Sequence, residues 1–423
     1  MSDFQASETP KVPIRTLTLF SAIVVGISAM VGTGVFVAWQ PAFELSGTYL
    51  LVALGIAAFI AVLNAVSNAR MARMFPESGG GYLYGRECIH PVAGQLAGWV
   101  FLIGKAASAS AAALAIGAYV SPGNEKVTAV AAIVVVLAIN LLGIRYSIVA
   151  MTILITVVLS VLISLSVIAG VTDSTSDSIL DSVTADVSVM NVLAAAGILF
   201  VAFAGYARIA VLGSEVRNAR RNIPIAIAVS LAIVVLLYFV IALVLFAYPD
   251  SLLTLAPLET TATLIGYPRF LVVVAAVLAA GSALFALMAG LGRMIYSMSI
   301  GGHLPKKMGV LVGQRAVPMR ADLVIAIGLI VITLAGSIGL NLAISATFIL
   351  IYYVVVHVSS WARPDKNPEN PENPENPENH ENPENHENSK GTWRSIALSR
   401  VIPGIGITAN TVVVAALVGS ALP

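Results

Sequence analysis

The chain has 423 residues, of which 58% are hydrophobic and only 11% are charged, and its formal net charge is +1. Together with a mean hydropathy of +0.91, this composition excludes an ordinary soluble domain and indicates an integral membrane protein, for which we expect no nucleic-acid partner. The single cysteine, Cys88, forms no disulfide within the chain.

Apolar stretches of membrane-spanning length recur along the whole sequence. About 20 helical residues cross a hydrocarbon core of about 30 Å. Eleven such spans are predicted, which makes the fold class all-α and integral to the membrane. The spans are 17–38, 49–72, 93–119, 127–144, 148–171, 192–213, 224–248, 270–298, 323–340, 343–361 and 402–422.

Glycines interrupt the first of these spans. The segment from Gly26 to Phe36 contains Gly32 and Gly34 within an otherwise apolar helical pattern. Lipid offers no water to backbone groups that a broken helix leaves free, so such a break must be buried in protein or line a cavity. We therefore interpret this interruption as part of a binding site.

The sixth span is interrupted in a similar way, around Gly205. If spans 1 to 5 and 6 to 10 are two five-helix repeats, the second is inverted, because five is odd. In inverted-repeat membrane proteins, paired broken helices mark a site near the midplane. Glycines that merely permit close helix packing are the alternative for either segment alone, but their matching positions favour a site.

The chain between spans 10 and 11 has a different composition. Residues 367–388 repeat an Asn-Pro-Glu pattern with His variants and contain no apolar residue. This segment is expected to be an extended, solvated linker without a catalytic role. Helix 11, beyond it, is expected to pack peripherally or at an oligomer contact.

Basic residues give the orientation, since loops that stay in the cytoplasm retain Lys and Arg. With the N-terminus inside, only Lys126 and Arg269 lie outside, whereas the external loop carries several Asp and no Lys or Arg. The expected organisation is a cytoplasmic N-terminal segment (1–16), a first repeat (17–171), an external loop (172–191), a second repeat (192–361), a cytoplasmic linker (362–401) and helix 11 (402–423).

Three segments carry a family resemblance. Residues 27–36 (ISAMVGTGVF), 75–82 (FPESGGGY) and 215–224 (EVRNARRNIP) resemble, in this order, the helix 1, helix 2 to 3 and helix 6 to 7 signatures of amino acid permeases of the amino acid-polyamine-organocation (APC) superfamily. The similarity covers roughly residues 13–362. It implies a LeuT-like 5+5 inverted-repeat bundle with broken helices 1 and 6, which works by alternating access and binds a free amino acid between those helices.

The resemblance implies that main-chain groups hold both charged ends of the substrate. The α-carboxylate is expected at the amides of Thr33 and Gly34, where the second half of helix 1 begins. The α-ammonium is expected at the carbonyls of Met30, Val201 and Ala204.

Three further residues complete the predicted substrate site. Gly32 and Gly205 lie in the unwound turns, and Phe203 is a candidate aromatic lid, with plain packing as an equal alternative. Similar permeases have Trp where this chain has Val201, which is a departure from the family pattern at the gate.

The charges available inside the spans bear on the substrate and on its coupling. All acidic residues lie outside the spans or near their ends, so a neutral amino acid is expected rather than a cationic one. Lys105 lies inside the third span and is a candidate for coupling transport to protons or for replacing a sodium ion as a fixed charge. The alternative is that it snorkels or pairs with a carbonyl or an acidic end group.

Three charged residues are gate candidates. Arg208, just after the helix 6 break, is placed to reach a substrate carboxylate or an external gate, or else to pair structurally near Glu44. Glu215 and Arg15, at the inner ends of helices 6 and 1, are placed to form an inward gate.

The function expected from the resemblance is secondary active transport of a free amino acid across the plasma membrane. Coupling to protons is expected, with no cofactor beyond an ion gradient, and the partners are the small-molecule substrate and membrane lipids. An amino acid or polyamine exchanger and a transporter-like substrate receptor are the alternatives. An enzyme is not expected, because no cluster of His, Asp or Glu lies at mid-depth.

Overall fold

The computed structural model describes residues 17–75, 79–142, 148–172, 187–211, 216–310, 319–362 and 389–421. Within these ranges the chain is helical apart from turns and one isolated bridge between Leu17 and Val216. The helices are α1 (Leu19–Met30), α2 (Gly34–Val37), α3 (Trp39–Ser46), α4 (Leu50–Met74), α5 (Gly80–Cys88), α6 (Pro91–Val120), α7 (Glu125–Leu141), α8 (Ile148–Val171), α10 (Val189–Phe203), α11 (Ala207–Val211), α12 (Ala219–Ala247), α13 (Pro257–Leu264), α14 (Arg269–Ile300), α15 (Met319–Ala335), α16 (Ile338–Ala362) and α17 (Ser389–Ala421), with 3₁₀ turns η1 (Gly47–Tyr49), η2 (Ala204–Tyr206), η3 (Pro249–Leu253) and η4 (Lys306–Gly309).

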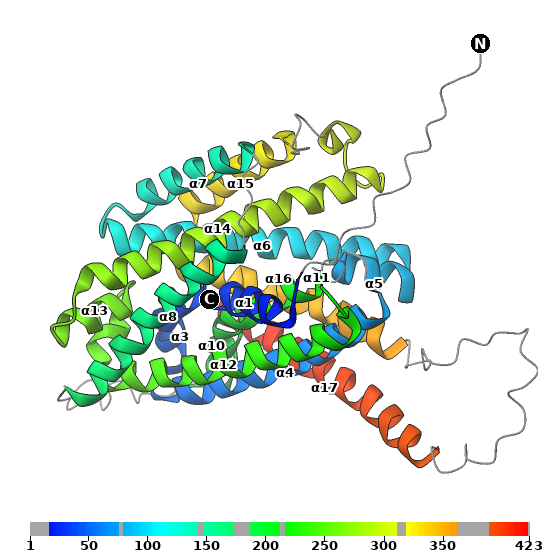
Figure 1. The fold of residues 1–423 in the computed structure, drawn as a ribbon, viewed down its shortest axis with the longest axis horizontal. Coiled ribbons are helices and arrows are strands. Elements are labelled where there is room, and N and C mark those ends of the chain that lie inside the picture. The colour runs from blue at the N-terminus through cyan, green and yellow to red at the C-terminus, as the bar shows by residue number, and fades with distance from the viewer. Residues whose placement is uncertain are drawn as a thin grey trace, which may run out of the picture.

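Each predicted span coincides with a helix or an interrupted helix. Nine helical segments of the described ranges are long and apolar enough to cross a membrane. The predicted spans 127–144 and 323–340 correspond to the shorter helices α7 and α15, each of 17 residues. Figure 1 shows α7 and α15 side by side at one edge of the bundle, with α6 and α14 beneath them and α4 and α12 at the opposite edge.

Small residues and hydroxyl groups hold α6 against its neighbours. Glycine and alanine dominate its buried face, which lets neighbouring backbones approach closely. Between helices, the hydroxyl of Ser108 lies 2.6 Å from that of Ser345 on α16, and the hydroxyl of Ser110 lies 2.8 Å from that of Thr333 on α15. The amide of Asn341 donates to Ser110 at 2.9 Å. These bonds satisfy polar groups that lipid would leave unpaired.

The two predicted interruptions are confirmed. The first span is divided into α1 and α2, which are separated by Val31, Gly32 and Thr33. The sixth span is divided into α10 and α11 by the turn η2. The inverted five-helix arrangement itself stays a prediction.

Helix 11 differs from the expectation in two respects. It begins at Ser389, well before Ile402, so residues 389–401 are helical and are not part of an extended linker. It is also less peripheral than expected, because one face of α17 packs on α4, α10 and α16. That face buries Asn410, Val413, Ala416 and Leu417.

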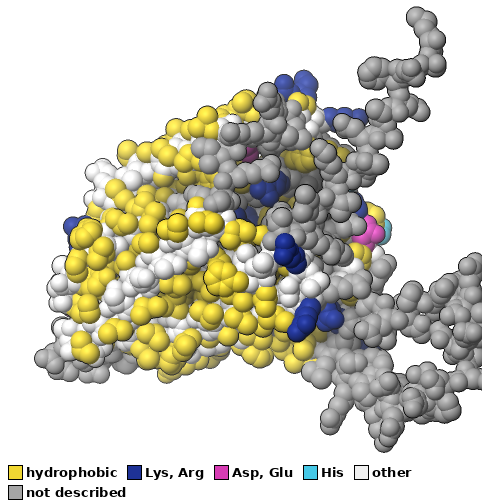
Figure 2. Space-filling model, in the orientation of Figure 1, with side chains coloured by type: hydrophobic (Ala, Val, Ile, Leu, Met, Phe, Trp, Pro, Cys, Tyr) yellow, Lys and Arg dark blue, Asp and Glu magenta, His cyan; other side chains and the backbone are white. Residues whose placement is uncertain are grey.

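The surface separates apolar from basic residues. Figure 2 shows hydrophobic side chains covering most of the molecule's flank, whereas most of the visible Lys and Arg gather toward the end at which α5 lies in Figure 1. An apolar flank with basic residues concentrated at one end is the pattern that a membrane-embedded bundle is expected to show.

Candidate functional site

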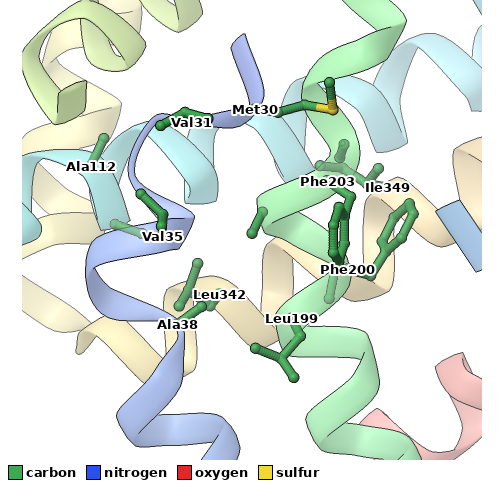
Figure 3. Packing of buried hydrophobic residues seen from close by; sticks show 14 of the residues in the cluster. Met30, Val31, Val35, Ala38, Ala112, Leu199, Phe200, Phe203, Leu342 and Ile349 are labelled. Carbon is green, nitrogen blue, oxygen red and sulfur yellow. The ribbon is translucent and has the colours of Figure 1, made fainter. Parts of the chain in front are cut away.

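The break in α1 leaves backbone donors free. After Met30 the chain leaves the helical conformation, and the amide of Gly32 turns back to donate to the Met30 carbonyl at 2.7 Å. Within the described ranges, the amides of Thr33 and Gly34 donate no backbone hydrogen bond. Figure 3 shows this non-helical passage from Met30 through Val31 to Val35 beside Phe203 and Phe200 of α10. Free amides at this depth require a partner that lipid does not supply.

The break in the sixth span lies directly against the break in the first. A Cβ atom added to Gly205 would overlap the carbonyl group of Ala29 and come within 2.6 Å of the Met30 nitrogen. Only glycine permits this contact between the two backbones. The structure therefore brings together two of the predicted site segments, residues 30–34 and 203–205.

A tyrosine that the sequence reasoning missed joins the two breaks. The hydroxyl of Tyr238, on α12, donates to the Met30 carbonyl at 2.6 Å and lies 3.3 Å from the Ala202 carbonyl. With Gly32 also donating to it, the Met30 carbonyl has two donors and no vacant position for a substrate ammonium in this conformation. The available signal in the sequence was a single tyrosine in an otherwise aliphatic span.

Several predicted site residues serve packing in this conformation. A Cβ on Gly34 would overlap the Cβ of Ala202, so this glycine lets α2 approach α10. A Cβ on Gly32 would lie 3.2 Å from the Cβ of Ala283 on α14. Phe203 is fully buried, with its ring centroid 5.0 Å from that of Tyr238. Its role as a lid stays a prediction.

Two hydroxyl groups beside the first break have no hydrogen-bond partner. The side-chain oxygens of Ser28 and Thr33 are enclosed and unpaired. Buried polar atoms are nearly always hydrogen-bonded, so unpaired hydroxyls next to free amides mark a place for a polar ligand or water.

The two basic residues inside the spans lie near each other and near the break. The charges of Lys105 on α6 and Arg208 on α11 are close enough to repel. The Nζ atom of Lys105 lies 5.9 Å from the ring centroid of Phe101, a weak cation–π contact. Both side chains are partly buried.

Two gate candidates, Arg15 and Glu215, lie outside the described residues. The nearest described groups do meet, since Leu17 forms an isolated bridge with Val216 and the amide of Arg217 donates to the Leu17 carbonyl at 2.8 Å. The inward gate stays a prediction. Likewise, the carbonyls of Val201 and Ala204 stay predicted acceptors, although the Val201 carbonyl accepts the Ala204 amide here.

Comparison with known proteins decides the family. The family model described as amino acid permease matches residues 17–420. The chain belongs to this family. It is placed in the APC superfamily, as the three sequence segments suggested, and it is a membrane transporter rather than an enzyme.

The relatives include transporters of several named substrates. An uncharacterized transporter of Mycobacterium tuberculosis is 40% identical over 360 residues, which cover 82% of this permease and 80% of that protein. The inner membrane transport protein YbaT of Escherichia coli is 26% identical, covering 83% and 84%. The vacuolar cationic amino acid transporter 2 of Arabidopsis thaliana is 25% identical, covering 84% of this chain and 61% of that protein.

Proposed function

We propose that this permease is a secondary active transporter that moves a free amino acid across the plasma membrane by alternating access. The observation that carries the proposal is the contact between the two helix breaks, where free amides and unpaired hydroxyls face one another around Gly205, Thr33 and Ser28. An amino acid zwitterion supplies both an anionic and a cationic end to such main-chain groups.

The mechanism requires the breaks to change their packing. In the present conformation Phe203 is buried, Gly34 touches α10 and the Met30 carbonyl is occupied. Substrate entry therefore requires α1 and α10 to separate, and closure around the substrate then exposes it to the other side. The substrate gains binding energy only in conformations in which these groups are free, which biases the equilibrium between the two states.

The charges inside the bundle favour a substrate without a cationic side chain. From the sequence we expect a neutral amino acid, because no acidic residue lies at mid-depth. Lys105 and Arg208 next to the break strengthen the argument against a cationic one. The cationic substrates named for some relatives are therefore not transferred to this chain.

Coupling to protons is proposed at Lys105, and the N-terminus is proposed to lie in the cytoplasm. An amine inside a membrane bundle releases its proton at lower cost than an arginine, which keeps its charge. Arg208 is then the fixed charge and Lys105 the exchangeable one.

The test is uptake of radiolabelled amino acids into proteoliposomes under a pH gradient, a sodium gradient or neither. Accumulation driven by the pH gradient is expected. Exchange of label for external cold substrate without net uptake would indicate an exchanger instead. Binding without any flux would indicate a substrate receptor.

A further inference from the structure

The intramembrane cations of this permease lack a compensating anion. Within the described ranges, neither Lys105 nor Arg208 forms an ion pair or hydrogen bond with a side chain. A basic residue at a helix centre costs about 2.5–3.5 kcal/mol on insertion scales. Two such residues that also repel each other need an anion that the described chain does not provide.

The charged groups around the pair do not supply that anion. Arg208 also faces the positive charge of Arg293 on α14. The acid near this group is Asp322 at the start of α15, whose attraction is to Arg293. A row of charges thus runs from Lys105 through Arg208 to Arg293, and it is closed by a carboxylate only at the Arg293 end.

Aromatic contacts locate the pair beside the substrate site independently of charge. From Lys105 over Phe101, ring contacts continue to Tyr352 at 5.5 Å, to Tyr353 at 5.3 Å and to Tyr206 at 5.9 Å. Tyr206 ends the turn η2, and Arg208 follows two residues later. The cations therefore flank the break of the sixth span.

We propose that Lys105 and Arg208 bind the side-chain carboxylate of a dicarboxylic amino acid. Its α-carboxylate would lie on the free amides of Thr33 and Gly34, with its side chain reaching across η2 toward the two cations. This inference rests on the proposed transport function and narrows it. The lack of mid-depth acids, which led to the expectation of a neutral substrate, excludes a cationic side chain but is equally compatible with an acidic one.

Glutamate and glutamine separate these cases, because they have the same shape and differ in one charge. Affinity and uptake of both are measured on the full-length protein in proteoliposomes, in chloride and in gluconate buffers. We expect glutamate, aspartate or both to be preferred over the matching amide by at least about tenfold, the loss that follows removal of a hydrogen bond to a charged group.

The variant Arg208→Gln tests the assignment within the chain. It is expected to reduce the glutamate-to-glutamine preference by about tenfold or more, and Arg208→Lys, which retains the charge, is expected to restore part of it. A residue that only supports the fold would lower both substrates together. Lys126→Met is the matched control, because Lys126 is an exposed cation whose Nζ donates to the Leu334 carbonyl, far from the break in sequence.

Three outcomes overturn the inference, and they are distinguishable from failure of transport itself. Uptake of glutamine but not glutamate leaves the transporter proposal intact and removes the anionic substrate. Glutamine binding that requires chloride assigns the cations to an inorganic anion. Absence of binding and flux for every amino acid refutes the proposed function, and the inference with it.

Discussion

Two polar regions lie inside this bundle, and they differ in whether their polar groups are paired. In the first region, between α4, α16 and α17, the side chains of Asn64, His357 and Asn410 are fully buried and bonded to one another. Asn410 donates to the Asn64 carbonyl oxygen at 2.8 Å, and the Nε2 atom of His357 lies 2.7 Å from the same oxygen. In the second region, at the helix breaks, amides and hydroxyls remain unpaired.

The difference indicates which region binds a ligand. The Nδ1 atom of His357 is the unpaired exception in the first region, but its ring lies so close to Gly406 that an added Cβ would overlap it. That region is closed and holds α17 to the core. The break region keeps free donors and two unpaired cations, which is expected of a site whose partner comes and goes.

The largest expected effect comes from Gly205→Ala. The new Cβ would collide with the backbone of Ala29 and Met30, and overpacking of this kind costs about 1–3 kcal/mol. Uptake should be lost and the thermal unfolding temperature lowered. The control is Gly281→Ala on α14, where an added Cβ meets nothing within 4 Å. Normal uptake by Gly205→Ala would show that the two breaks need not touch.

The next effect is on coupling. Replacing the amine in Lys105→Met should abolish accumulation driven by a pH gradient while leaving some exchange, because the exchangeable charge is removed. The measurement is the ratio of internal to external substrate across a range of external pH, with Lys126→Met as the exposed-cation control. An unchanged response to pH would remove Lys105 from the coupling role.

Sequence reasoning located helices and breaks better than it located contacts. Periodicity and glycine placement predicted the spans and both interruptions, because each depends on local composition. The role of Gly34 against Ala202 and the bond from Tyr238 to Met30 were missed. Both depend on which helices are neighbours, and that information is not local in the sequence.

Helix 11 illustrates the same limit from the opposite direction. Its separation from the rest by a repetitive segment suggested a peripheral element, yet Asn410 is fully buried. A lone asparagine in an apolar span was the available signal, since such a residue seeks a partner on a neighbouring helix. Its partner, Asn64, lies 346 positions away in the sequence, too far for any local pattern to identify.

The paired region predicts a pure stability effect. In Asn410→Leu, the buried amide of Asn64 loses its partner, which costs about 1–3 kcal/mol for an unsatisfied group. Denaturation in detergent should show this loss, whereas the ratio of glutamate to glutamine affinity should stay that of the unaltered protein. A changed ratio would mean that the network reaches the substrate site and that the two regions are not separate.

The smallest expected effect is that of Tyr238→Phe, which retains the ring contacts with Phe203 and Trp39 and removes one hydroxyl. Loss of the bond to Met30 should lower stability by about 0.5–1.5 kcal/mol. It should also weaken substrate binding less than about tenfold, because the breaks are held together less firmly. Tyr248→Phe is the matched control, since its hydroxyl bonds the Ala169 carbonyl at 3.1 Å, away from the breaks. If Tyr238→Phe instead binds substrate more tightly, the hydroxyl competes with the substrate ammonium for the Met30 carbonyl, and the bond belongs to the empty conformation alone.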